Sequence, residues 1–124
     1  MVTRFRVHDR GQFAQASRAA LARLAESPGF LGGAIGQSTD ETDLLVVTTR
    51  WSSVGAYRKA LQRYEVKLEV VPWLSTAIDE SSAYEVVFDI SHDAHHEAVS
   101  GRAADADHAR LGEAAAPHVP PVHT

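Results

Sequence analysis

Within residues 1–89, apolar residues alternate in some segments, as in β-strands, and recur every three or four places in others, as in helices. The order of these segments constrains the fold of this chain more than any other feature. Residues 2–8 alternate, with Phe5 and Val7 on one side, which is typical of a half-buried strand. Apolar residues then recur every three or four places over residues 13–24, which predicts a helix. The chain therefore opens with a strand followed by a helix.

Local signals mark where this first helix begins and ends. Asp9 is followed three residues later by Gln12, a spacing that resembles a capping box. Pro28 and Gly29 end the helical pattern. Residues 30–38 then form a glycine-rich predicted strand. Its glycines are interpreted as positions where a helix or a ligand can approach the sheet closely.

The second half of the pattern repeats the first. A polar turn at residues 39–43 leads into residues 44–51, which are strongly β-prone. Ser52 or Ser53 can cap a second helix, and Pro72 is expected to break or restart it. The expected inner face of this helix consists of Val54, Tyr57, Leu61, Tyr64 and Leu68. Residues 83–89 close the set as a last strand.

The resulting order is β-α-β-β-α-β, which is the split βαβ arrangement of an α+β, ferredoxin-like fold. We expect a four-stranded antiparallel sheet with both helices on one face. Residues 44–47 are apolar on both sides, so the uncovered face of the sheet needs a partner. A symmetric homodimer that packs sheet against sheet would supply it.

The composition changes near residue 90. Residues 1–89 contain every aromatic residue and are the predicted domain. Residues 90–124 are rich in Ala, His and Asp and contain six of the seven histidines, but few large apolar residues. Such a segment buries too little surface to offset its ordering entropy. It is interpreted as a mobile or weakly helical tail, or as one that docks on the body or on a partner subunit.

Composition also excludes several classes of protein. Cysteine is absent, which removes disulfides and thiolate chemistry. The net charge of −4 argues against a nucleic-acid partner. No apolar run approaches the roughly 20 residues of a membrane helix, and no secretory signal is visible at the N-terminus. A cytoplasmic protein with no membrane partner is expected.

Three short motifs carry a resemblance to a known family. They are PGF at residues 28–30, WSS at residues 51–53 leading into the helix of Tyr57, and YEVV at residues 84–87. Together with the order of elements, they resemble the antibiotic biosynthesis monooxygenase family over residues 3–88. Members of this family are ferredoxin-like proteins that form dimeric α+β barrels.

The resemblance implies a cofactor-independent monooxygenase that acts on an aromatic or polyketide-like small molecule. Such enzymes bind the substrate between sheet and helices and promote its deprotonation, and the carbanion then reacts with oxygen without metal or flavin. The catalytic candidates that follow from it are Trp51, Tyr57 and Arg50. The substrate-binding candidates are Tyr64, Trp73, Phe13, Arg6 and His8.

The chain departs from the family pattern in one respect, because it contains no asparagine. A mechanism in which an Asn amide holds the oxygen adduct is therefore excluded. The haem-degrading branch is excluded as well, since no histidine lies between Trp51 and Tyr84. The alternative to an enzyme is a non-catalytic homodimer of the same fold that binds a ligand or has a structural role.

Each candidate also has a structural interpretation. Trp51 and the tyrosines can be core residues instead of pocket residues. Arg4 and Arg6 can form an ion pair with Glu85 of a second subunit instead of binding a phenolate. His8 is either a general base or a solvated residue at the end of a strand.

The histidine-rich segment has two interpretations of its own. His92 and His96 would lie on one face of a helix at the spacing of a metal site, with His95 beside them. The pattern lacks the glutamate of the zinc-protease motif between its histidines. A solvated tail without a metal is therefore the preferred interpretation.

Overall fold

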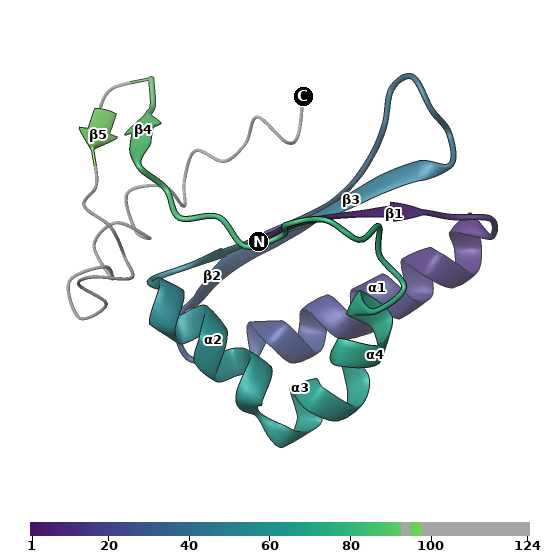
Figure 1. Ribbon diagram of the computed structural model, residues 1–124, viewed down its shortest axis with the longest axis horizontal. Helices are drawn as coiled ribbons and strands as arrows, with labels where there is room; N and C mark the ends of the chain where they lie inside the picture. The colour runs from purple at the N-terminus through teal and green to yellow at the C-terminus, as the bar shows by residue number, and fades with distance from the viewer. Residues whose placement is uncertain (93–94, 98–124) are drawn as a thin grey trace.

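The structure is a computed structural model that describes residues 1–92 and 95–97. Its elements follow one another as shown in Figure 1. They are β1 (Val2–Arg6), α1 (Arg10–Ala25), β2 (Phe30–Gln37), β3 (Leu44–Trp51), α2 (Val54–Gln62), α3 (Tyr64–Glu69), α4 (Val71–Leu74), β4 (Phe88–Ile90) and β5 (His95–Glu97).

Three strands form the main sheet in the order β1-β3-β2, and both neighbouring pairs are antiparallel. All four helices lie on one face of this sheet (Figure 1). The hydrophobic core fills the space between the two layers, with Leu24, Val47, Val66 and Val70 fully buried. The predicted α+β, ferredoxin-like fold class is thereby confirmed.

Both predicted helix starts are confirmed, and each is marked by a capping hydrogen bond between a side chain and a backbone N–H. The Asp9 carboxylate accepts a bond of 3.0 Å from the Gln12 backbone N–H at the start of α1. The Ser53 hydroxyl accepts one of 2.9 Å from the Ala56 N–H at the start of α2. Each cap satisfies one of the N–H groups that a helix leaves unpaired in its first turn.

The predicted second helix is broken, which corrects its expected inner face. Arg63 has extended backbone angles, φ −68° and ψ 141°, between α2 and α3. This residue shifts the helical phase, so a spacing of seven no longer places Tyr57 and Tyr64 on one face. Tyr64 is 71% exposed, whereas Val66 is fully buried.

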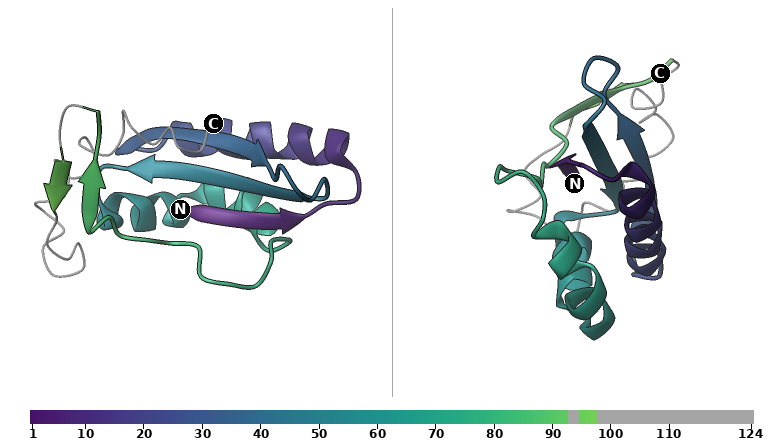
Figure 2. Two further views of the ribbon diagram at one scale, coloured as in Figure 1. Left: turned by 90° about the horizontal axis from the view of Figure 1, so that it is seen from above. Right: turned by 90° about the vertical axis from the view of Figure 1, so that its right-hand side faces the viewer.

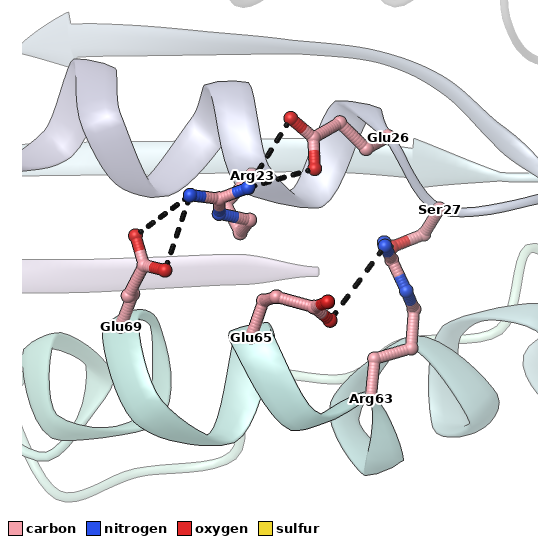
Figure 3. Close-up of polar contacts among 6 residues, drawn as sticks. All are labelled: Arg23, Glu26, Ser27, Arg63, Glu65 and Glu69. Carbon is pink, nitrogen blue, oxygen red and sulfur yellow. Dashed lines mark hydrogen bonds and ion pairs between the residues drawn. The ribbon is translucent and has the colours of Figure 1, made fainter.

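Ion pairs hold α3 against α1 (Figure 3). Arg23 of α1 contacts Glu26 and, across the interface, Glu69 of α3, each at 3.1 Å. Arg63 donates a hydrogen bond of 2.7 Å to the Ser27 hydroxyl. Solvent screens exposed pairs of this kind, so they contribute little and apolar burial dominates the packing.

The last predicted strand does not join the main sheet. Residues 78–82 already run beside β1, because the Ile78 N–H donates to the Arg4 carbonyl at 2.9 Å and the Val2 N–H donates to the Ser82 carbonyl at 2.7 Å. With the edge of β1 taken, residues 83–87 form no strand. The described sheet therefore has three strands instead of the predicted four.

A separate two-stranded sheet follows. β4 pairs antiparallel with β5, and both lie beyond the end of the main sheet (Figure 2). This pair crosses the boundary that the sequence predicted at residue 90. Most of the predicted tail, residues 93–94 and 98–124, lies outside the described residues.

Within the described ranges, none of the helices is long and apolar enough to cross a membrane.

Candidate aromatic site and the opposite sheet face

Trp51 is the centre of a first aromatic cluster, at the end of β3. Its ring lies 5.2 Å from that of Phe30, edge to face, and 5.6 Å from that of Tyr57 on α2. The indole N–H donates to the Thr49 hydroxyl at 2.7 Å. The WSS motif produces this arrangement, since Trp51 ends the strand and Ser53 caps the helix that carries Tyr57.

Tyr57 supplies the polar group of this cluster. It is partly exposed, and burial raises the pKa of its phenol above the ordinary value of 10.0. The hydroxyl therefore stays protonated at neutral pH and can donate a hydrogen bond to a developing oxyanion. No other described residue forms a hydrogen bond with this hydroxyl.

A second aromatic cluster surrounds Phe5. The ring of Trp73 on α4 stacks on Phe5 at 4.9 Å, and Phe13 of α1 lies at the same distance on a tilt. The Trp73 indole N–H donates to the Ser17 hydroxyl at 3.2 Å. Of the substrate-binding candidates, the structure thus brings Phe13 and Trp73 together.

The two clusters share the core but are separate groups, since no ring contact within the described residues joins Trp51 to Trp73. The ring contacts therefore place Trp51 and Trp73, two candidates from the sequence, in different clusters. Each indole N–H has an acceptor within the chain, as core tryptophans usually do.

Arg50 lies on the face of the sheet away from the helices. Neighbouring residues of a strand point to opposite faces, and Trp51 is buried on the helix side. The Arg50 guanidinium lies over Gly32 of β2, where any Cβ would collide with it. Arg50 therefore lies on the opposite face of the sheet from Trp51, so the three catalytic candidates from the sequence do not share one face.

The remaining candidates lie outside both clusters. Arg6 contacts Glu41 at 2.9 Å and Asp43 at 3.1 Å in the turn between β2 and β3. These two acidic partners raise the pKa of Arg6. His8 is exposed just after β1, and Tyr64 is exposed on α3.

Arg4 also has a partner in its own chain, because it contacts Glu80 with two hydrogen bonds of 2.7 Å. This bond lowers the pKa of Glu80 and raises that of Arg4. The intersubunit pairs expected for Arg4 and Arg6 are therefore replaced by pairs within the chain.

A cavity of about 270 Å³ lies beside the outer edge of β1. It is lined by Thr3, Leu74, Ser75, Ala77, Ile78, Asp79, Glu80 and Ser82. The buried Thr3 hydroxyl has no partner among the described residues. None of the candidates from the sequence lines this cavity. The alternating pattern of β1 could have pointed to Thr3, because Thr3 lies on the same inward face of the strand as Phe5.

Two threonine substitutions test whether the Thr49 hydroxyl is hydrogen-bonded and the Thr3 hydroxyl is not. Thr49→Val leaves the buried Trp51 N–H without its acceptor, so we expect a loss of about 1–3 kcal/mol in the free energy of unfolding. Thr3→Val removes a hydroxyl without a described partner, so stability should stay within about 1 kcal/mol or rise. Chemical denaturation of both variants checks the difference, and equal losses would contradict it.

The predicted helical spacing of the histidines is wrong. His95 and His96 belong to β5, so a helix does not place His92 and His96 on one face. In the part of the chain that the structure describes, no group of three His, Cys, Asp or Glu side chains is placed to hold a metal ion.

Comparison with known proteins places this fold in a family. The family model described as antibiotic biosynthesis monooxygenase matches residues 1–68, which include both helix caps and the Trp51–Tyr57 cluster. This chain belongs to the antibiotic biosynthesis monooxygenase family. The YEVV segment at residues 84–87 lies beyond the matched region of this family member.

Two solved structures share the fold of this antibiotic biosynthesis monooxygenase family member. One is a mutant of SnoaB, a cofactor-independent oxygenase from Streptomyces nogalater, with 23% identity, a TM-score of 0.56, and coverage of 62% of this chain and 80% of SnoaB. The other is a conserved protein from Methanosarcina mazei Go1, with 15% identity, a TM-score of 0.55, and coverage of 66% and 82%. None of the curated proteins matches.

Proposed function

We propose that this protein is a cofactor-independent monooxygenase that oxidises an aromatic or polyketide-like small molecule. The observation that carries the proposal is the family match over residues 1–68. The description of SnoaB as a cofactor-independent oxygenase supports the same class of reaction.

In this proposal, Trp51 and Tyr57 form the catalytic end of the site. The indole ring of Trp51 offers an apolar face to an aromatic substrate. The protonated Tyr57 phenol donates a hydrogen bond to the substrate oxygen as that oxygen becomes anionic. The substrate releases its proton to solvent, and the electron-rich anion passes an electron to oxygen. The two radicals combine through a C–O bond into a peroxide, which loses water to leave a carbonyl. One oxygen atom enters the product, the other leaves as water, and the substrate supplies all four electrons.

Oxygen uptake tests this function. Protein stripped of metal and free of flavin is mixed with a panel of hydroquinones and anthrone-like phenols, and oxygen consumption is followed with an electrode. Uptake above the rate of the buffer blank is expected for at least one phenol. Uptake that requires added flavin or iron would refute the cofactor-independent mechanism.

A non-catalytic homodimer of the same fold is the second candidate. The packing of Trp51 and Trp73 into the core favours it, since both indoles have acceptors within the chain. The absence of asparagine in the sequence is consistent with it. Failure of every phenol in the panel, with the folded protein intact, would favour this candidate over the enzyme.

We also propose that the protein is a homodimer whose sheets pack face to face. Among residues 1–92 and 95–97, no helix covers the side of the main sheet opposite α1–α4 (Figure 1), and Leu44 and Val46 of β3 are only partly buried there. Interfaces of this kind commonly bury on the order of 2,000 Å² in total.

Light scattering measures this assembly directly. At micromolar concentration we expect a mass of about 27 kDa, twice the chain mass of 13.4 kDa. A folded protein that keeps the mass of one chain would contradict the homodimer. The cytoplasmic location expected from the sequence stays a prediction.

A further inference from the structure

Two buried hydroxyls accept hydrogen bonds from the two tryptophan side chains. The Trp51 indole N–H donates to the Thr49 hydroxyl at 2.7 Å. The Trp73 indole N–H donates to the Ser17 hydroxyl at 3.2 Å. Thr49 and Ser17 are 4% and 0% exposed, so water does not compete for either bond. The two bonds lie in different places, because Trp51 belongs to the cluster that contains Tyr57 and Trp73 does not.

The hydroxyl of Thr49 has a fixed direction. Thr49 and Trp51 are two places apart in β3, so both side chains lie on the helix side of the sheet. The Thr49 N–H donates to the Met1 carbonyl at 2.9 Å, and Thr49 pairs with Gly33 on the other side of β3. An added Cβ at Gly33 would lie 3.4 Å from the Thr49 methyl carbon, so this methyl lies over the glycine. A β-branched side chain has few χ1 states, and the packed methyl leaves the hydroxyl directed at Trp51.

This hydrogen bond decides which part of the Trp51 indole a ligand can meet. An indole has a single N–H, and here it is already paired within the chain. What remains is the ring, which contacts Phe30 edge to face at 5.2 Å and Tyr57 at 5.6 Å with an interplanar angle of 57°. The Tyr57 hydroxyl is therefore the donor of this cluster, and its place relative to the indole depends on how the indole is held.

We propose that Thr49 is a positioning residue of the site that Trp51 and Tyr57 form. By holding the indole N–H, it fixes the ring against which an aromatic substrate lies beside the Tyr57 hydroxyl. Rotation of the indole about χ2 would move the substrate relative to this donor. A misplacement of about 1 Å can lower a rate about 100-fold, so a hydroxyl that never touches the substrate can still govern turnover. The inference rests on the proposed oxygenase activity.

Substitution of the hydroxyl tests its role in turnover. Thr49→Val keeps the shape of the side chain and removes the acceptor, so kcat for oxygen uptake should fall at least about tenfold. KM should change less than about threefold, because the ring that binds the substrate is still present. Thr49→Ser keeps the hydroxyl and should retain kcat within about threefold of the wild-type value. The phenol is the one that the wild type oxidises fastest, and an oxygen electrode measures the rates.

Ser17→Ala is the matched control. It removes the hydroxyl that accepts from the other indole N–H, at an equally buried position. Loss of this buried hydrogen bond lowers stability as well, but kcat should stay within about threefold of the wild-type value. A purely structural role of Thr49 predicts equal effects of Thr49→Val and Ser17→Ala on kcat, so the comparison separates positioning from stability.

Nuclear magnetic resonance reports the hydrogen bond without any activity. The chain contains two tryptophans, so an isotope-labelled sample gives two indole N–H signals. Thr49→Val should move one signal and speed its hydrogen exchange at least about tenfold, and Ser17→Ala should do the same to the other. Thr49→Ser should leave both signals near their wild-type positions.

Circular dichroism selects the folded variants, and Thr49→Ala replaces Thr49→Val if the latter does not fold. A folded Thr49→Val variant with the wild-type kcat overturns the positioning role while the oxygenase stands. Equal losses of kcat in Thr49→Val and Ser17→Ala overturn it as well. Unchanged indole signals in Thr49→Val overturn the hydrogen bond itself. A wild type that takes up no oxygen overturns the oxygenase and the positioning role together, whatever the indole signals show.

Discussion

Replacing Gly29 with alanine is expected to lower the free energy of unfolding by about 3 kcal/mol, the largest stability effect predicted for this chain. Gly29 has a φ of 89°, which residues with a side chain rarely adopt. A Cβ at this position would lie 2.5 Å from the Ala56 Cβ and 2.7 Å from the Ser52 hydroxyl. The backbone strain and the collision add to one another, and chemical denaturation measures their sum.

Gly11→Ala provides the control for this substitution. Gly11 lies in the first turn of α1, where an added Cβ would come no closer than 3.6 Å to the Asp9 carboxylate. Alanine has the higher helix propensity, so stability should be unchanged or rise by up to about 1 kcal/mol. A Gly29→Ala variant as stable as Gly11→Ala would contradict the predicted close approach of the 28–30 turn to α2.

Tyr57→Phe is expected to slow oxygen uptake about 100-fold with the phenol that the wild type oxidises fastest. The substitution removes the proposed hydrogen-bond donor to the substrate oxyanion and keeps the ring that contacts Trp51 at 5.6 Å. The melting temperature should therefore change little. Because burial raises the pKa of Tyr57, the wild-type donor stays protonated to a higher pH than an ordinary tyrosine.

Tyr64→Phe is the matched control for this experiment. Tyr64 is 71% exposed on α3, outside both aromatic clusters, so its hydroxyl should not affect the rate. Equal slowing of both variants would indicate an effect unrelated to the Trp51–Tyr57 cluster. A wild-type rate in Tyr57→Phe would remove the proposed donor while leaving the oxygenase activity in place.

Several parts of the fold could be predicted because the interactions that form them lie close together in the chain. The Asp9 and Ser53 caps each use a backbone N–H three residues away. The bounds of β3 follow from a β-prone run between two turns. The opposite faces of Arg50 and Trp51 were also available from strand alternation, although the resemblance grouped them in one site.

Other parts were decided by contacts between distant residues. Nothing local marks Arg63 as the break in the second helix, yet its extended backbone allows Val66 to enter the core and leaves Tyr64 outside. Likewise, the edge of β1 is occupied by residues 78–82 before the predicted last strand can reach it.

The sequence by itself therefore determined the fold class, the starts of α1 and α2 and the inward face of β1, because periodicity and capping are properties of neighbouring residues. The tertiary structure decided which side chains meet. It separated Trp51 from Trp73 and gave Arg4 a partner at Glu80, 76 residues along the chain. The reason is that contacts between distant residues depend on how the layers pack, and the hydrophobic pattern specifies only which face each residue presents.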